Sequence, residues 1–152
     1  MIENHGLIEY LLTSGGDLSD RESLTARQIK HFTDEMPGGF FIYRDDNDRI
    51  LYINRALLQI FGCETEEEFQ ALTGGTFSGM IYPEDAEAVA ASIQEQIAQN
   101  SFDLDYVEYR IVRRDGSVCW VEDFGHFIRT ETMGDVFYVF LADITERRRR
   151  RA

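Results

Sequence analysis

The last third of the chain contains three segments rich in β-branched and aromatic residues, over residues 102–113, 118–129 and 136–144. Short turn signals separate them: an Asp-Gly pair at 115–116, which favours a two-residue hairpin loop, and Met-Gly-Asp at 133–135. Consecutive strands joined by such short turns pair in antiparallel fashion. This end of the sequence therefore predicts an antiparallel sheet.

Two further β-prone runs, 40–44 and 50–53, are separated by a polar turn and predict another hairpin. Between this hairpin and the C-terminal strands, capping and periodicity signals predict helices over residues 55–61, 65–72 and 83–100. The order ββαααβββ is not a βαβ repeat. It predicts an α+β domain in which helices cover one face of a five-stranded antiparallel sheet.

Helical spacing of apolar residues precedes the first strand at residues 8–12 and again at 20–36. With 152 residues the chain suits a single domain. We divide it into a helical extension over residues 1–36, a core domain over 37–145 and the start of a further helix over 146–152.

The chain is acidic, with 28 Asp and Glu against 15 Lys and Arg and a net charge of −13. Such a body repels nucleic acid and anionic membranes, so we expect neither as a partner. The arginines at 147–151 are expected to be attracted to the acidic body or to a partner helix instead. No apolar run approaches the roughly 20 residues that cross a bilayer, and the N-terminus lacks a signal-peptide pattern. We expect a cytoplasmic domain with reduced cysteines.

No constellation in the sequence points to catalysis. The three histidines have no metal-ligand spacing, and no Ser or Cys has a recognisable base motif. The acidic turn at 45–48 lacks the ligand pattern of a calcium loop. We therefore expect no catalytic residues and no metal site.

Several motifs occur in a specific order: Asn54 before the first core helix, then "FGCETEEEF", "IYPEDAEAV", "EYRIVRRDGSVCWVE" and "ADITERR". Together they resemble the PAS sensor-domain family over about residues 30–148. The resemblance implies the PAS fold, with N-terminal helices flanking or covering the second face of the sheet. It also implies a non-catalytic domain that binds a small molecule or partner between sheet and helices. Such domains pass a signal through flanking helices to an output domain.

The residues that define two cofactor-binding PAS branches are missing. The flavin photosensors have a glutamine where Leu141 stands, asparagines at Ile111 and Val121, and a cysteine within the segment matching 73–82. The haem-binding relatives need a histidine on the long helix, and residues 84–99 contain none. Flavin and haem are disfavoured, and the cofactor, if any, is unknown.

Because strand side chains alternate between faces, the same alignment assigns one set of residues to the helix-covered inner face. The candidate ligand-pocket residues on this face are Tyr109, Ile111, Val121, Asp123, Phe127, Phe137, Val139 and Leu141. Tyr109 and Asp123 are the polar exceptions and could orient a small ligand. A hydrogen-bonded pair in an ordinary core is the alternative.

The opposite, outer face is also apolar and needs a cover. We expect the helix at 20–36 to lie there, together with that of a second subunit, so the chain is predicted to form a homodimer. Covering by the helix within one monomer is the alternative. The residues assigned to this face are Trp120, Phe124, His126, Tyr138 and Phe140.

The resemblance makes Asp143 and Thr145 the signal-relay junction between the last strand and the outgoing helix. We expect a nearby cation to hold the Asp143 carboxylate and the Thr145 hydroxyl to cap a helix starting at Glu146. The leading hypothesis is a ligand-sensing domain with a covalently linked output domain, a diguanylate cyclase or histidine kinase. A ligand-free dimerisation or docking module is the alternative, and a free-standing enzyme is a weak third.

Overall fold

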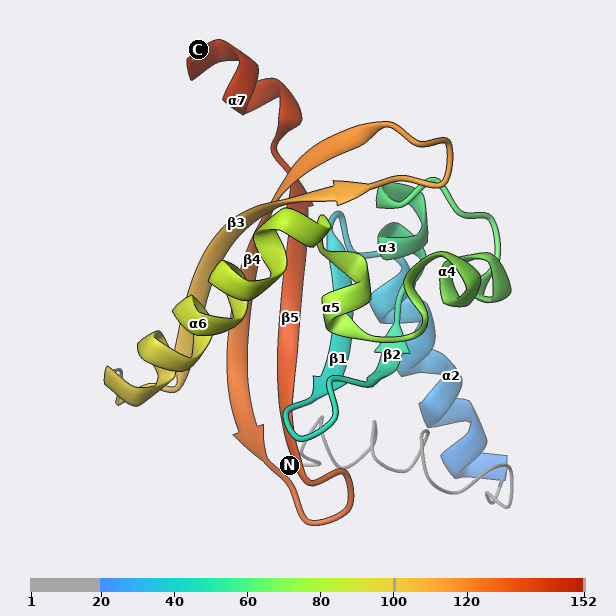
Figure 1. Cartoon of the computed structure of the whole chain (residues 1–152). Helices are drawn as coiled ribbons and strands as arrows, with labels where there is room; N and C mark the ends of the chain where they lie inside the picture. Colours follow the sequence, from blue (N-terminus) through green and yellow to red (C-terminus); the bar gives the residue numbers. More distant parts are fainter. Residues whose placement is uncertain (1–19, 100, 152) are drawn as a thin grey trace.

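A computed structural model describes residues 20–99 and 101–151. Its centre is a five-stranded antiparallel sheet with the strand order β2-β1-β5-β4-β3 (Figure 1). The strands are β1 (Gly39–Arg44), β2 (Ile50–Ile53), β3 (Leu104–Val112), β4 (Val118–Arg129) and β5 (Asp135–Asp143). The predicted α+β architecture is confirmed.

Four helices follow the β1–β2 hairpin and lie on one side of the sheet, which we call the inner face (Figure 1). They are α3 (Arg55–Ile60), α4 (Glu66–Thr73), α5 (Phe77–Met80) and α6 (Pro83–Gln99). The helix α5 was not predicted, because four residues are too short to show a helical period. Its start is marked by the Thr76 side chain, which accepts a hydrogen bond from the Gly79 N–H at 3.1 Å.

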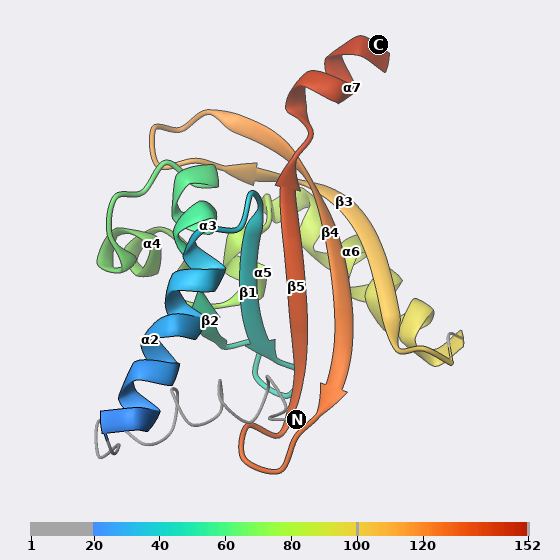
Figure 2. The same ribbon diagram turned by 180° about the vertical axis from the view of Figure 1, so that it is seen from behind.

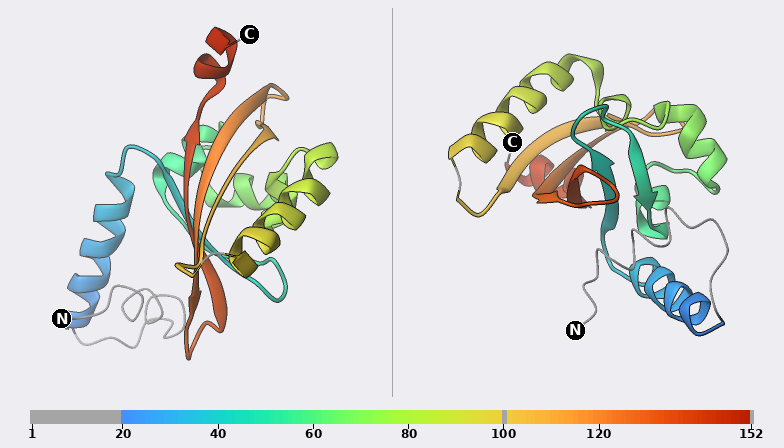
Figure 3. Two further views of the ribbon diagram at one scale, coloured as in Figure 1. Left: turned by 90° about the vertical axis from the view of Figure 1, so that its left-hand side faces the viewer. Right: turned by 90° about the horizontal axis from the view of Figure 1, so that it is seen from below.

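Two more helices extend away from this layer: α2 (Asp20–Asp34) and α7 (Thr145–Arg151). Seen along the sheet, α2 and α6 lie on opposite sides of it (Figure 3). The helix predicted at residues 8–12 lies outside the described residues. Within the described part of the chain, no helix is both long and apolar enough to span a membrane.

The strand β1 joins the two halves of the sheet, because it pairs with its hairpin partner β2 on one side and with β5 on the other. The hairpin between β3 and β4 differs in detail from the prediction of a two-residue loop. Arg113 N–H donates to the Ser117 carbonyl at 2.8 Å, so the loop holds the three residues 114–116. Gly116 closes it with a φ of 88°, the left-handed conformation typical of bulged three-residue hairpins.

Asn54 is the buried hub at which α2, β1 and α3 meet. Its Oδ1 accepts hydrogen bonds from the N–H groups of Leu57, at 3.1 Å, and Phe40, at 2.8 Å. Its Nδ2 donates to the carbonyls of Thr33, at 2.7 Å, and Gly38, at 3.1 Å. The predicted helix cap is confirmed, and the same side chain also ties the first strand to the preceding helix.

The main core lies between the inner face and helices α3 to α6. A smaller apolar cluster lies on the outer face, where Ile29 and Met36 pack against Phe40 and Ile42 of β1. Figure 2 shows α2 on this side, over the β1 and β2 half of the sheet. The β3 and β4 half is left without a helical cover from α2.

Candidate functional site

All eight predicted ligand-pocket residues lie on the inner face and are buried. The structure thus brings together the side chains that strand alternation grouped from the sequence. Their role in ligand binding stays a prediction. The inner face divides into an apolar end and a polar end.

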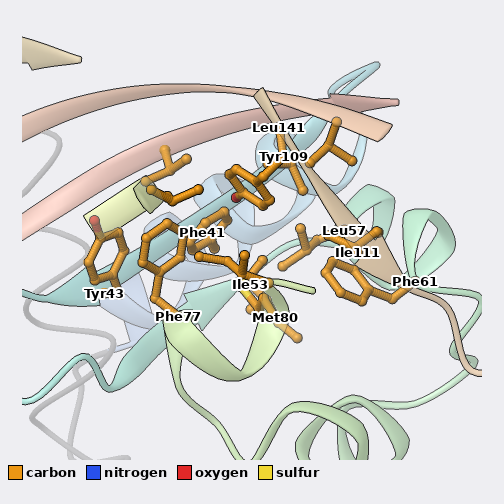
Figure 4. Packing of buried hydrophobic residues seen from close by; sticks show 14 of the residues in the cluster. Phe41, Tyr43, Ile53, Leu57, Phe61, Phe77, Met80, Tyr109, Ile111 and Leu141 are labelled. Atoms are coloured by element: carbon orange, nitrogen blue, oxygen red, sulfur yellow. The ribbon is translucent and has the colours of Figure 1, made fainter. Parts of the chain in front are cut away.

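The apolar end contains Ile111, Val121 and Leu141, none of which has any exposed surface. Leu57 and Phe61 from the α3 region pack at the same end, as the close view shows (Figure 4). These side chains belong to one buried apolar cluster between the sheet and the helices. The apolar end of the inner face is therefore an ordinary part of the hydrophobic core.

The polar end is built around Tyr109 and Asp123, which are fully buried neighbours on β3 and β4. The Tyr109 hydroxyl donates a hydrogen bond to Asp123 Oδ2 at 2.7 Å. Burial raises the pKa of Asp123 well above its usual value, and the negative charge of Asp105 raises it further. The hydrogen bond from Tyr109 acts in the opposite direction but does not cancel these effects. The pKa of Tyr109 is raised as well, mainly by burial and then by the Asp123 charge. The pair is therefore held in a low-dielectric compartment.

Two further polar groups belong to this end, and the sequence analysis missed both. Asp105 is 5% exposed, and burial raises its pKa from 3.8 to about 6. Tyr43 of β1 is buried beside the same compartment, and its pKa is raised by burial and by the charges of Asp123 and Asp105. The sequence could have indicated Asp105, because it lies two residues before Val107 on β3 and therefore faces the same side of the sheet.

Aromatic rings form a wall across this polar end. Phe127 and Phe137 have ring centroids 5.1 Å apart, and Phe137 stacks on Tyr43 at 4.9 Å. Phe77 of α5 continues the stack from Tyr43 at 4.3 Å, and Figure 4 shows these two rings side by side. Two carboxylates and two phenols thus converge beside aromatic faces, an arrangement typical of ligand-orienting sites.

The outer-face residues divide into two groups. Phe124 and Phe140 lie directly opposite each other on β4 and β5 and remain 51% and 43% exposed, with His126 exposed beside them and Tyr138 half-buried. Trp120 is instead covered by two arginine side chains of the same chain. The Arg148 guanidinium lies 3.5 Å from its ring centroid, and the Arg110 guanidinium lies at 5.6 Å.

Asp143 and Thr145 lie at the predicted junction between β5 and α7, but their contacts differ from the predicted ones. Asp143 Oδ1 accepts hydrogen bonds from the Thr145 N–H, at 2.9 Å, and the Thr145 hydroxyl, at 2.6 Å, and no ion pair joins it to a cation of the described residues. The helix α7 starts at Thr145 itself, and the Thr145 hydroxyl accepts the Trp120 N–H at 3.0 Å. The prediction of a threonine cap at Glu146 is therefore wrong, because the hydroxyl is used to bind α7 to β4.

The arginines of α7 clamp the helix to the outer face of β3 and β4. Arg147 pairs with Glu122 at 2.7 Å, and Arg148 pairs with Glu108 at 2.8 Å. The Tyr106 hydroxyl shares its single proton between the two carboxylates, at 2.6 Å from Glu108 and 3.0 Å from Glu122. The expected attraction of this tail to the acidic body is confirmed.

This clamp also explains why two glutamates can face each other across the sheet. Glu108 and Glu122 are direct partners in the β3–β4 register, where like charges are destabilising unless they are compensated. The Tyr106 hydrogen bond, together with the nearby arginines, lowers the pKa of Glu108. The two strands and α7 therefore form one electrostatic unit.

Among the described residues, no group of three or more His, Cys, Asp or Glu side chains could hold a metal ion. The candidate sites are thus the polar end of the inner face and the α7 clamp on the outer face. They share the strands β3 and β4.

Comparison with solved structures finds the same fold in signalling proteins. A PAS domain of an HTR-like protein from Haloarcula marismortui has a TM-score of 0.62 and 24% identity, over 82% of this chain and 95% of that chain. A sensory box histidine kinase/response regulator from Burkholderia thailandensis has a TM-score of 0.57 and 20% identity, over 87% and 90%. The N-terminal domain of a diguanylate cyclase with a PAS/PAC sensor from Marinobacter aquaeolei has a TM-score of 0.52 and 19% identity, over 73% and 98%.

No curated protein sequence matches the chain significantly. A family model, described as PAS fold, matches residues 50–140. This match runs from β2 to β5 and so contains both carboxylates of the inner face and both glutamates of the clamp. The chain therefore belongs to the PAS-fold family.

Proposed function

We propose that this chain is a sensory domain that binds a small ligand at the polar end of the inner face and relays its presence through α7. In this proposal residues 37–145 form the sensor, 1–36 form a helical extension, and 146–152 begin the signalling helix. The domain works in the cytoplasm, which suits its two free, buried cysteines.

One observation carries the proposal: the ligand-side residues and the helix anchors alternate on the same two strands. On β3, Tyr109 points inward and its neighbour Glu108 points outward to Arg148. On β4, Asp123 points inward and Glu122 points outward to Arg147. Adjacent residues of a strand face opposite sides, so a shift of the inner pair displaces the anchors of α7.

The output is a covalently linked enzyme domain, for which a diguanylate cyclase or a histidine kinase is the best-supported choice. PAS domains of both kinds of protein share this fold. In this proposal α7 would connect β5 to such a domain, with Asp143 and Thr145 as the junction.

The ligand-free dimerisation or docking module remains the second candidate. The observation that favours it is the exposed apolar pair Phe124 and Phe140, together with the complete burial of the side chains at the apolar end of the core. A homodimer through the outer face is compatible with both candidates, because the sensor also leaves this face uncovered.

Mass spectrometry of small molecules released from the purified chain tests the choice between them. We expect one species in stoichiometric amount, and its return to the emptied protein should change the emission of Trp120, the single tryptophan of the chain. Trp120 reports on α7 because Arg148 lies on its ring. If no species is released and the emission responds to none of the compounds in a metabolite collection, the ligand-free module is the better description.

A further inference from the structure

Asp105 is a buried carboxylate whose charge is left uncompensated by the described residues. Its side chain is almost completely inaccessible, and neither Oδ1 nor Oδ2 has a hydrogen-bond partner there. The group lies against Gly125 of β4, where a Cβ atom would overlap the carboxylate. Buried carboxylates normally have a hydrogen bond or a cation, since an unpaired one costs several kcal/mol. Asp105 therefore indicates a partner that the chain does not supply.

A second carboxylate lies diagonally beside it on the same face. Asp105 is opposite Gly125 in the β3–β4 register, and Asp123 is opposite Val107, two residues away on each strand. The charge of Asp105 contributes to the raised pKa of Asp123, so the two groups share one electrostatic compartment. Tyr109 donates one hydrogen bond to Asp123, and among the described residues no ion pair reaches either carboxylate.

The aromatic side chains at the polar end of the inner face also favour the binding of a cation. Phe127 lies two residues beyond Gly125 on the same face of β4, and its ring is tilted against that of Phe137, which stacks on Tyr43. The face of an aromatic ring attracts cations. The charges of Asp105 and Asp123 act on the Tyr43 hydroxyl as well, which places that group within the same negative field. The carboxylates and these rings suit an organic cation better than a metal ion, which would need more oxygen ligands than the described residues bring together here.

We propose that the polar end of the inner face binds a small organic cation with N–H donors, an ammonium or guanidinium group, that pairs with Asp105 beside the hydrogen-bonded pair of Asp123 and Tyr109. This inference rests on the proposed sensor function and names its ligand class. The N–H groups satisfy the two orphan oxygens, and the aromatic wall of Phe127, Phe137 and Tyr43 packs against the cation. A neutral ligand would leave the charge of Asp105 uncompensated.

The test is a titration of the full chain with methylammonium and guanidinium chlorides, followed by NMR of the Asp105 carboxyl carbon. Sodium chloride at equal ionic strength is the reference, and methanol is the neutral isostere of methylammonium. We expect saturable shifts with the two N–H cations alone. Binding should weaken at least about tenfold in Asp105→Asn and stay unchanged in Asp103→Asn, a partly exposed aspartate two residues away.

Tetramethylammonium, a cation with no N–H group, should bind at least about tenfold more weakly than methylammonium. Equal binding of the two, equal binding of methanol, or equal binding to Asp105→Asn would each overturn the proposal. The absence of a saturable shift with every cation would also overturn the proposal. This outcome is read from the Asp105 resonance of the wild type, so it does not depend on whether the variant folds. The sensor function is judged separately, by the molecules released from the purified chain.

Discussion

At the scale of single residues, Asn54 stabilises the junction of three elements through four hydrogen bonds inside the protein. Asn54→Ala would leave two buried N–H groups and two buried carbonyls without their partner. We expect the free energy of unfolding to fall by about 3 kcal/mol, measured by urea denaturation. Asn47→Ala, in an exposed turn where one hydrogen bond is lost, is the matched control and should cost less than about 1 kcal/mol. Similar losses in the two variants would contradict the role of Asn54 as a hub.

Asp105 makes the stability of the empty protein depend on pH. Its folded-state pKa of about 6 lies above the ordinary value of 3.8, so the folded chain binds more protons than the unfolded chain between these values. Its contribution to the free energy of unfolding therefore decreases as the pH rises through this window. The groups that share its compartment are Asp123, Tyr43 and Tyr109.

The comparison of wild type with Asp105→Asn isolates this effect. Between pH 4 and pH 7, the stability of the wild type relative to the variant should fall by about 2 kcal/mol, measured by urea denaturation at several pH values. Asp103→Asn should show no such trend, because this aspartate is partly exposed and has Arg129 as an ion-pair partner. A constant difference across the pH range would show that Asp105 is not the titrating group.

At the scale of elements, α7 is held to the sheet by charge rather than by apolar burial, since none of its residues is buried. Arg148→Ala removes both the ion pair with Glu108 and the cover of Trp120. We expect red-shifted Trp120 emission and faster amide exchange in α7, with a loss of only about 1 kcal/mol in its docking free energy. Fluorescence and hydrogen exchange measure the two effects.

The adjacent arginine provides the control for this prediction. Arg149 pairs with Glu146 within α7, so Arg149→Ala should leave the emission of Trp120 unchanged. High salt should reproduce the effect of Arg148→Ala, because partly exposed ion pairs are screened. If the two variants behave alike, α7 is held by something other than the Arg148 contacts.

At the scale of the whole molecule, the exposed part of the outer face predicts self-association. Phe124→Asp combined with Phe140→Asp places charge at the centre of this patch, and we expect the dimer to dissociate in light scattering. Phe102→Asp introduces the same charge in place of an exposed phenylalanine in the turn before β3, and should leave the dimer intact. A monomeric wild type, or a dimer that survives the double substitution, would refute an interface at this face.

Much of the architecture could be predicted because it rests on local signals. Alternating strands, an asparagine cap and an Asp-Gly turn act within a few residues, and all of these appear in the structure near their predicted positions. The short helix α5 could not be predicted, since its four residues have no measurable period. The length of the β3–β4 loop also escaped prediction, because Asp-Gly fits both two-residue and three-residue hairpins.

By itself, the sequence determined most of the secondary structure, the inner and outer faces of the C-terminal strands and the family. Only the tertiary structure decided which polar groups meet: Asp105 with Asp123 under an aromatic wall, and the α7 arginines with Glu108 and Glu122. The physical reason is that alternation assigns a side chain to a face, whereas strand register and the direction of a docked helix select its neighbours. The separation of these partners, up to 40 residues along the chain, leaves no trace in any local pattern.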